Sequence, residues 1–523
     1  MKTVRVHSAC LEGAGAFLVT VQARFEPAQQ GPTEIHLTGL PDAILRESRG
    51  RLACVLGASR LKAGSGRLHL HLTPAARRKS GEGLDLALVL ASAAAVGHLR
   101  PSQVSGALFL GEVGIDGTLA STPGGLAAAL EARRQGITEI VAPPTAAREA
   151  AELPDVAAYE ASTLQDVLHH LTRGADDPER RPALQPGPTA EVGPPSGRAL
   201  DEIRGQSEAK FALQVAAAGG HGLLLVGPPG AGKTMLARRL GDLLPPPYLE
   251  ERIAATAIRS AAGRPPEGLV SERPFRAPHH TTSFAGLLGG GNPIAPGEIT
   301  LAHGGVLFLD ELPEFRREAL EGLRQPLEEG VVHIARAGRR LSLPAAFQLV
   351  AAMNPCPCGY AGHPRVVCRC PPSAVRRYRQ RISGPVLDRI DLRVALRPVP
   401  LEDLVPGTAS PSGPAASAGA GPSAGAGARL IDEARAARLR SVHREAQEAA
   451  CNARLRSDEL DAVAPLGRGP ADLLRRAADG RQLSSRAVQS LRRVARTVAD
   501  LAGRERIDTE AMATALALRE GIA

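Results

Sequence analysis

The sequence predicts an α/β protein with three folded blocks, because two segments look unable to pack a core and because short apolar runs alternate with helical stretches between them. Residues 172–197 are rich in proline, glycine and charge, as a linker is, and residues 401–428 have the low-complexity composition of a disordered loop. These two segments separate an N-terminal block, 1–171, from a central block, 198–400, and a C-terminal block, 429–523. Three domains suit a chain of 523 residues.

The N-terminal block combines strand and helix patterns. Alternating or β-branched residues predict strands at Phe17–Phe25 and Arg67–Leu72. Helical patterns predict helices at Leu84–Val96 and Gly125–Arg134. We therefore expect a mixed α+β domain.

The central block alternates short apolar runs with helical stretches. The runs Leu223–Val226, Val306–Leu309 and Gln348–Ala352 predict buried strands of a parallel sheet that is covered on both faces. The C-terminal block is rich in Arg, Ala and Leu, has helical periodicity and shows no strand pattern. It predicts a small helical bundle.

Composition narrows the classes of function. The net charge of +9 is compatible with a polyanionic partner, but aromatic residues make up 2% of the chain and Trp is absent. Any nucleic-acid binding is therefore expected to use phosphate contacts more than base stacking. The first residues lack the apolar segment of a secretory signal, and the longest apolar stretch, Leu86–Gly97, is too short to span a bilayer. We expect a cytoplasmic protein with reduced cysteines and no membrane partner.

A phosphate-binding motif follows the first apolar run of the central block. Its residues are Gly227, Pro228, Pro229, Gly230, Ala231, Gly232, Lys233 and Thr234. They fit GxxxxGK[ST] between a strand and a helix, a context in which backbone N–H groups cradle phosphate oxygens. We expect Lys233 to reach the β- and γ-phosphates of ATP and Thr234 to ligate Mg²⁺. The alternative is a glycine-rich turn without a ligand, which the flanking strand and helix disfavour.

Polar residues also follow the next two apolar runs. Asp310 and Glu311 come directly after Val306–Leu309, at the end of a strand where ligands bind in parallel sheets. We expect Asp310 to hold the Mg²⁺ and Glu311 to act as the general base that activates water. Asn354 follows the third run, where its side chain is suited to orienting that water. The alternative for Asn354 is a cap of the turn before Pro355.

Taken together, these motifs resemble the Mg-chelatase-like AAA+ ATPases, and most closely the family called ComM or YifB. The most specific stretches outside the phosphate-binding motif are Gly205–Gln206, Ala216–His221, Phe275–Thr281, Gly297–Val306 and Ser383–Asp391. The resemblance spans nearly the whole chain. It implies an N-terminal Lon-protease-like domain, a central AAA+ P-loop ATPase core and a C-terminal helical lid.

The resemblance also implies roles for individual residues. Asn354 matches sensor 1, Arg486 matches sensor 2 of the lid, and Gly205 and Gln206 fall where the adenine pocket lies. Arg389 matches the arginine finger that completes the site of a neighbouring subunit.

A finger of this kind requires a head-to-tail ring, and family members are expected to be hexamers. Without the resemblance, the alternative for Arg389 is a surface salt bridge with Asp388 or Asp391.

The N-terminal block lacks the catalytic pair of a Lon peptidase. Aligned with the Lon pattern, Gly83 stands at the position of the nucleophilic serine and Ala127 at that of the lysine base. We therefore expect a scaffold or a DNA-contact platform. A shifted pair made of Lys79 and Ser80 is the alternative.

Four cysteines lie close together after Asn354. They are Cys356, Cys358, Cys368 and Cys370. Two pairs joined by a short excursion are able to close a tetrahedral site, so we expect structural Zn²⁺. Unliganded thiols are the alternative, and His363 is a possible substitute for one ligand.

Two segments of the central block are candidates for DNA contact. Val331–Leu343 predicts a β-hairpin with Ala337 and Gly338 near its tip. The arginines around that tip are Arg336, Arg339 and Arg340. Six copies of such a hairpin in a ring would line a positive channel suited to a phosphate backbone. The alternative is a solvated charged turn, and Arg276–Pro296 is the second candidate loop.

Three functions remain compatible with these features. The first is a hexameric DNA motor, a branch-migration helicase of natural transformation or recombination. The second is a magnesium-chelatase motor subunit, and the third is a protein-remodelling AAA+ chaperone. The Lon-like block disfavours the second, and the lack of an aromatic residue in the hairpin disfavours the third. The sequence therefore favours the DNA motor.

Overall fold

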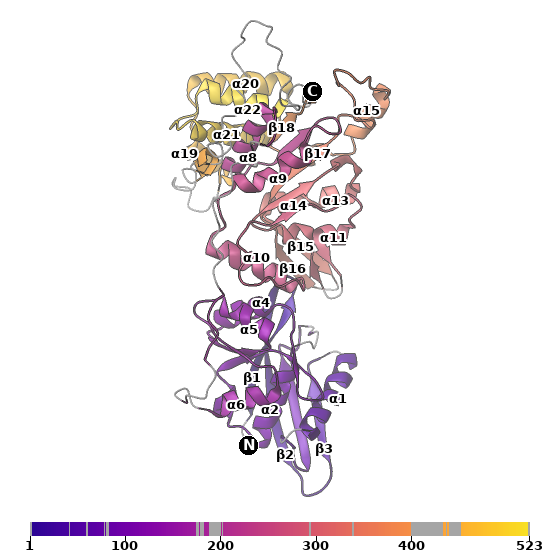
Figure 1. The fold of residues 1–523 in the computed structure, drawn as a ribbon, viewed down its shortest axis with the longest axis vertical. Helices are drawn as coiled ribbons and strands as arrows, with labels where there is room; N and C mark the ends of the chain where they lie inside the picture. The colour runs from indigo at the N-terminus through magenta and orange to yellow at the C-terminus, as the bar shows by residue number, and fades with distance from the viewer. Residues whose placement is uncertain are drawn as a thin grey trace.

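The computed structural model shows an elongated molecule, with the N-terminal domain at one end, the central sheet in the middle and the C-terminal helices at the other end (Figure 1). It describes residues 3–40, 42–58, 61–77, 79, 83–173, 177, 182–187, 200, 202–291, 294–336, 339–398, 432–435, 437–438 and 451–520. The expected loop 401–428, most of the expected linker 172–197, Ser80, Ala337 and Gly338 lie outside the described residues.

The N-terminal domain is built on a seven-stranded sheet of order β3-β4-β2-β1-β5-β8-β9. Its strands are β1 (Val4–Glu12), β2 (Gly15–Pro27), β3 (Thr33–Thr38), β4 (Gly66–Thr73), β5 (Ala107–Phe109), β8 (Glu139–Ala142) and β9 (Ala157–Glu160). Strand β2 pairs antiparallel with β1 and β4, whereas the other neighbours pair parallel. A separate two-stranded ribbon joins β6 (Glu112–Val113) to β7 (Leu119–Ala120). The strands predicted within β2 and β4 are confirmed.

Helices pack against this sheet and supply much of its core. They are α1 (Asp42–Ala58), α2 (Asp85–Val96), α3 (Pro101–Val104), α4 (Gly125–Arg134), α5 (Pro144–Ala151) and α6 (Leu164–Thr172). Helix α2 is buried from Asp85 to Ala94 and ends where Gly97 adopts a left-handed conformation that favours glycine. The predicted helices α2 and α4 are confirmed, so the mixed α and β composition of this domain agrees with the sequence pattern.

The central sheet has five strands in the order β11-β14-β17-β10-β18, and every neighbouring pair is parallel. The strands are β10 (Leu223–Val226), β11 (Phe275–Arg276), β14 (Val306–Leu309), β17 (Gln348–Met353) and β18 (Leu392–Ala395). Leu223 and Leu225 enter a core shared with α8 (Ser207–Gly219) and α9 (Lys233–Leu243), whereas Leu224 and Leu307 enter a separate core on the other face. The predicted parallel sheet, buried on both faces, is confirmed.

Short elements surround this sheet. The helices are α10 (Leu249–Ala261), α11 (Phe284–Leu288), α12 (Glu298–Leu301), α13 (Arg317–Gly322), α14 (Arg324–Glu329), α15 (Pro372–Arg379), α16 (Gly384–Leu387) and the 3-10 helix Leu312–Glu314. Two hairpins, β12 (Gly289–Gly290) with β13 (Ala295–Pro296) and β15 (Val331–Arg336) with β16 (Arg339–Pro344), are antiparallel. The second is the predicted hairpin.

The described C-terminal part beyond residue 450 is helical. Its elements are the 3-10 helix Asn452–Arg454, α19 (Ser457–Val463), α20 (Arg468–Arg481), α21 (Ser485–Leu501) and α22 (Thr509–Glu520). Helix α21 packs on α22 and on α8 of the central domain, which gives these helices and the sheet a common core. Arg496 is fully buried there, where Asp500 at 3.1 Å and the carbonyl oxygen of Glu505 at 2.6 Å compensate its charge.

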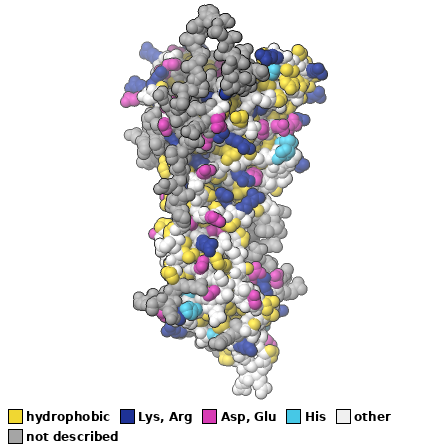
Figure 2. Space-filling view, viewed as in Figure 1, with side chains coloured by type: hydrophobic (Ala, Val, Ile, Leu, Met, Phe, Trp, Pro, Cys, Tyr) yellow, Lys and Arg dark blue, Asp and Glu magenta, His cyan; other side chains and the backbone are white. Residues whose placement is uncertain are grey.

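Surface charge does not separate by sign in the view of Figure 2, where basic and acidic side chains are interspersed along the molecule. Among the described residues, the structure shows no helix with both the length and the apolar character needed to cross a membrane.

A buried polar contact joins the N-terminal and central domains. The hydroxyl of Ser260 on α10 donates to the Glu149 carboxylate on α5 and accepts a hydrogen bond from the backbone N–H of Gly124 at 2.9 Å. The same carboxylate accepts the N–H of Leu126 at 3.0 Å. Burial raises the pKa of Glu149, although these hydrogen bonds lower it in part. The two domains therefore share a satisfied buried acid.

Candidate nucleotide-binding site

The phosphate-binding turn connects β10 to α9 at the carboxyl edge of the central sheet. Gly230 and Gly232 have φ angles of 77° and 85°, in the left-handed region that favours glycine. Gly227 leaves no room for a side chain, since a Cβ there would lie 2.8 Å from the Cβ of Leu396. The spaced glycines of the motif are thus explained by backbone conformation and by packing.

Lys233 contacts residues that follow two different strands, β10 and β17. Its ammonium group donates to the carbonyl oxygens of Gly227 at 2.7 Å and Pro228 at 3.0 Å, and to the side-chain oxygen of Asn354 at 3.0 Å. Burial lowers the pKa of Lys233, whereas the charges of Asp310 and Glu311 act in the opposite direction. The structure therefore brings the predicted lysine and the predicted polar tip of β17 into contact.

Asp310 follows strand β14, and its contact with Thr234 adds the end of a third strand to the site. The Thr234 hydroxyl donates to Oδ2 of Asp310 at 2.9 Å. Two neighbouring ligands of an octahedral Mg²⁺, each about 2.1 Å from the ion, lie about 3 Å apart. The spacing of these two oxygens therefore fits a shared Mg²⁺.

Glu311 has an unusual backbone and one unpredicted partner. Its φ angle is 51°, a conformation that costs free energy for a residue other than glycine, and its N–H donates to Oδ1 of Asp310 at 2.9 Å. Its carboxylate lies 3.1 Å from Nδ1 of His280, whose ring contacts that of His279. The stretch Phe275–Thr281 contained this histidine, but no sequence spacing linked it to Glu311.

Gly205 and Gln206 lie beside the turn. Both adopt left-handed conformations, and the Gln206 amide donates to the carbonyl oxygen of Arg397 at 2.7 Å and to that of Ala231 at 3.4 Å. This pair therefore contacts the phosphate-binding turn, next to the place where the resemblance puts the adenine pocket.

The structure gives Arg389 and Arg486 a different environment from that of Lys233. Both guanidinium groups form ion pairs with Glu328, and Arg389 also donates to the carbonyl oxygen of Pro385 at 2.6 Å. The alternative that paired Arg389 with Asp388 or Asp391 is therefore wrong about its partner. Glu328 is a second residue that the sequence did not single out, because it lies 61 and 158 positions from the two arginines.

The four clustered cysteines come together as expected. Their sulfur atoms all lie within 4.8 Å of one another, with Cys356, Cys358 and Cys368 separated by 3.3 to 3.6 Å. Backbone N–H donors lower the pKa of the Cys358 thiol to about 6.

The candidate ligand His363 uses its Nδ1 within its own loop, where this atom accepts the N–H groups of Arg365 at 3.1 Å and Val366 at 2.9 Å. The cysteine loop also touches the nucleotide site, since a Cβ on Gly359 would lie 2.6 Å from Pro229.

The predicted hairpin is anchored at its base. Val332 and Leu343 are buried in the core of the central domain, and Arg340 is exposed farther out. Arg336 and Arg339 are paired in register, while the structure describes neither their side chains nor the tip between them.

The turn between β1 and β2 packs on the hairpin, because a Cβ on Gly13 would lie 2.5 Å from both Leu341 and Leu343. In the second candidate loop, Arg276 is bound by Glu298 through contacts of 2.6 and 2.8 Å.

Of the alternative pair made of Lys79 and Ser80, the structure describes Lys79 alone. Lys79 is fully buried and donates to the carbonyl oxygens of Gly39, Pro74 and Arg77 at 2.6 to 3.1 Å. Burial lowers the pKa of Lys79, whereas the three carbonyl oxygens favour its charged form.

Three family profiles match the chain. The profile described as magnesium chelatase, subunit ChlI, matches residues 199–404. One described as subunit ChlI of Mg-chelatase matches residues 26–146, and one described as magnesium chelatase, subunit ChlI C-terminal, matches residues 426–519.

Similar proteins extend over the whole length. A Salmonella typhimurium protein called YifB is 37% identical over 522 residues, which cover 99% of this chain and 97% of that protein. The competence protein ComM of Haemophilus influenzae is 37% identical over 525 residues, covering 99% and 98%. The magnesium-chelatase 67 kDa subunit of Chlorobaculum parvum is 29% identical over 161 residues, covering 30% and 23%.

Similarity of this extent, with the convergence of Lys233, Thr234, Asp310 and Asn354, shows that the chain belongs to the ComM/YifB family of magnesium-chelatase-like proteins.

Proposed function

We propose that the chain is an ATP-hydrolysing AAA+ motor that assembles into a hexameric ring and acts on DNA, as a branch-migration helicase of natural transformation or recombination. The observation that supports ATP hydrolysis most directly is the meeting of Lys233, Thr234, Asp310 and Asn354 at one edge of a parallel sheet. Ligands bind at this edge in such folds.

The site residues divide the chemistry among them. The backbone of the phosphate-binding turn and Lys233 would hold the triphosphate, and Thr234 and Asp310 would hold a Mg²⁺, which supplies positive charge to the phosphate oxygens. Glu311 accepts a proton from the attacking water, and Asn354 orients that water. Lys233 now donates to two backbone carbonyls and Asn354, and phosphate oxygens replace the carbonyls when ATP binds.

Two variants distinguish the residues needed for ATP binding from the residue needed for ATP hydrolysis. Lys233→Ala removes the ammonium group that holds the phosphates, so nucleotide binding is lost. Glu311→Gln keeps the binding groups and removes the base, so ATP binds while turnover falls by about 10²- to 10⁴-fold. Fluorescent-nucleotide titration and steady-state ATPase assays measure the two effects. Equal turnover in Glu311→Gln and wild type would show that another group is the base.

DNA is the proposed substrate because of the hairpin β15–β16. The base of the hairpin is fixed in the core, and Arg340 is exposed farther out. In a ring, the basic ends of several hairpins would contact the same DNA molecule. The chain is also similar, over 98% of that protein, to a Haemophilus influenzae protein named competence protein ComM. A magnesium-chelatase-type motor is the second candidate, favoured by the chelatase profiles.

Replacing Arg339 and Arg340 with Ala removes two phosphate contacts per subunit. We expect DNA-stimulated ATPase to fall to the basal rate and DNA affinity to fall by about tenfold or more, with basal ATPase unchanged. Exposed arginines of the same domain, Arg316 and Arg317, provide the matched control pair. Assays with single-stranded, duplex and four-way-junction DNA, followed by strand exchange, distinguish the helicase from the chelatase. Full stimulation in the hairpin variant would remove the hairpin as the DNA contact.

The cysteine cluster is proposed to hold a structural Zn²⁺. Four sulfur ligands about 2.3 Å from a tetrahedral ion lie about 3.8 Å apart, and three of the sulfur atoms already lie 3.3 to 3.6 Å apart. The loop contacts Pro229 of the phosphate-binding turn, so the metal would support the nucleotide site without taking part in catalysis.

Metal analysis of the purified protein tests this assignment. We expect one zinc per chain, and we expect Cys368→Ser to lose it and to lower the thermal unfolding midpoint by several degrees. Cys54→Ser changes an exposed cysteine far from the cluster in sequence and serves as the control. Protein that carries no metal and is indifferent to Cys368→Ser would contradict a zinc site.

A further inference from the structure

Glu328 joins two arginines that come from distant parts of the chain. It lies in the last turn of α14, and its Oε1 forms ion pairs with both Arg389 and Arg486. The Arg389 side chain is 10% exposed, whereas those of Glu328 and Arg486 are each 38% exposed. Because both guanidinium groups contact one oxygen atom, a single small anion is able to bind both.

The segment that carries Arg389 is fixed to the helix that carries Arg486. The Ser484 hydroxyl caps α21 and also lies 3.2 Å from the Asp388 carboxylate. On the other side of Arg389, the Asp391 carboxylate accepts a hydrogen bond of 2.5 Å from Ser490 of the same helix. Contacts on both sides of each arginine hold the two side chains at a defined separation.

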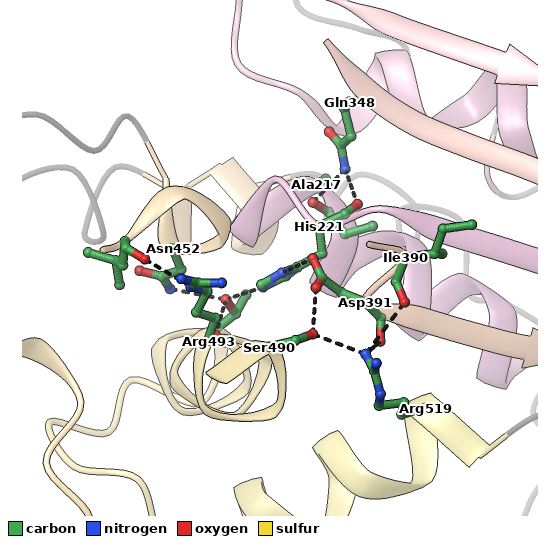
Figure 3. A network of polar contacts seen from close by, with 12 residues as sticks. Ala217, His221, Gln348, Ile390, Asp391, Asn452, Ser490, Arg493 and Arg519 are labelled. Carbon is green, nitrogen blue, oxygen red and sulfur yellow. Dashed lines mark hydrogen bonds and ion pairs between the residues drawn. The ribbon is translucent and has the colours of Figure 1, made fainter. Parts of the chain in front are cut away.

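A second layer of contacts supports Asp391 (Figure 3). Its other oxygen lies 3.1 Å from His221, whose Nε2 contacts the Thr497 hydroxyl at 2.8 Å. Arg519 donates to Ser490 at 3.2 Å and contacts the backbone carbonyl oxygens of Ile390 and Asp391 at 3.5 Å. The arginine pair thus lies beside a polar network that joins the central domain to the C-terminal helices, in which His221 and Ser490 are buried.

The pair has more capacity to bind an anion than Glu328 uses. Burial lowers the pKa of Arg389, and the positive charges of Arg486 and Arg324 lower it further, although Glu328 opposes this. Among the described residues, the Nε–H of Arg389 has no acceptor. A phosphate group offers several charged oxygens and suits two guanidinium groups better than one carboxylate does.

We propose that Glu328 is an internal competitor that occupies Arg389 and Arg486 in the free chain, and that a phosphate of the nucleotide on a second copy of the chain displaces its carboxylate. This inference rests on the proposed function, because it takes the partner to be a nucleotide-bound neighbour. In the free chain Glu328 prevents the largely buried Arg389 from being left as an unpaired charge. On assembly, one anion replaces another at the same two guanidinium groups.

An internal competitor has a measurable consequence. The carboxylate must leave before the phosphate binds, so its attraction for the arginines opposes nucleotide-dependent assembly. Glu328→Gln removes the charge and retains a hydrogen-bonding oxygen. We expect the concentration of a non-hydrolysable ATP analogue needed for half-maximal assembly to fall by about two- to fivefold, which corresponds to the free energy of a charge pair near a surface. Glu328→Asp, with a shorter carboxylate, is expected to shift it by less in the same direction.

Analytical ultracentrifugation of the full chain with this analogue and Mg²⁺ measures the shift. Glu329→Gln is the matched control, because Glu329 is the next residue of α14 and contacts Gln325 and His333 instead of the arginines. Unchanged assembly in Glu328→Gln, or assembly that needs more nucleotide, overturns the proposal. If Glu328→Gln does not fold, the same two outcomes are judged with Glu328→Asp.

Nucleotide titration of the dilute, unassembled chain separates this inference from the proposed function. Binding at the Lys233 site does not involve Glu328, so all variants are expected to bind the analogue equally before assembly. Loss of binding in every form, wild type included, would contradict the proposed ATPase. Normal binding and assembly without a shift in Glu328→Gln would contradict the role of Glu328 alone.

Discussion

The arrangement of three parallel strand ends is the constraint on which the nucleotide site depends. Strands β10, β14 and β17 are buried on both faces, so their positions are set by the two cores of the central domain. Strands β14 and β17 are followed directly by Asp310 and Asn354, and β10 is followed by the phosphate-binding turn. The parallel pairing brings these ends to one edge. The order of the strands therefore places Lys233 in contact with Asn354, and Thr234 in contact with Asp310. Stability and site geometry therefore come from the same burial of apolar strands.

Cations in this chain are provided with internal acceptors that a phosphate is able to replace. Lys233 is held by backbone carbonyls of its own turn, and the pair of Arg389 and Arg486 is held by Glu328. A partly buried cation without an acceptor is destabilising, so these contacts keep the cationic groups in place. Under the proposed function, binding would exchange one acceptor for another with little reorganisation of the surrounding structure.

The sequence predicted what depends on local spacing and missed what depends on packing between distant segments. The phosphate-binding motif, the acidic pair and the buried strands of the central sheet were predicted, because uninterrupted apolar runs and the fixed spacing of the motif are local. Strands β5 and β8 have three and four residues, too few to show a period. The alternative that paired Arg389 with Asp388 or Asp391 was wrong about the partner, since the fold directs these two carboxylates toward α21 and leaves Glu328 for the arginine. His280 was missed for the same reason.

The central claim is that one Mg-bound triphosphate is held jointly by the phosphate-binding turn and the acidic strand end. A structure determined with a non-hydrolysable ATP analogue and Mn²⁺ in place of Mg²⁺ tests this most directly, because anomalous scattering locates the ion. The account predicts Mn²⁺ between the Thr234 hydroxyl and Asp310, with the Lys233 ammonium moved from the carbonyls of Gly227 and Pro228 onto the phosphates. Phosphates bound away from Lys233, or an ion that contacts neither Thr234 nor Asp310, would contradict it.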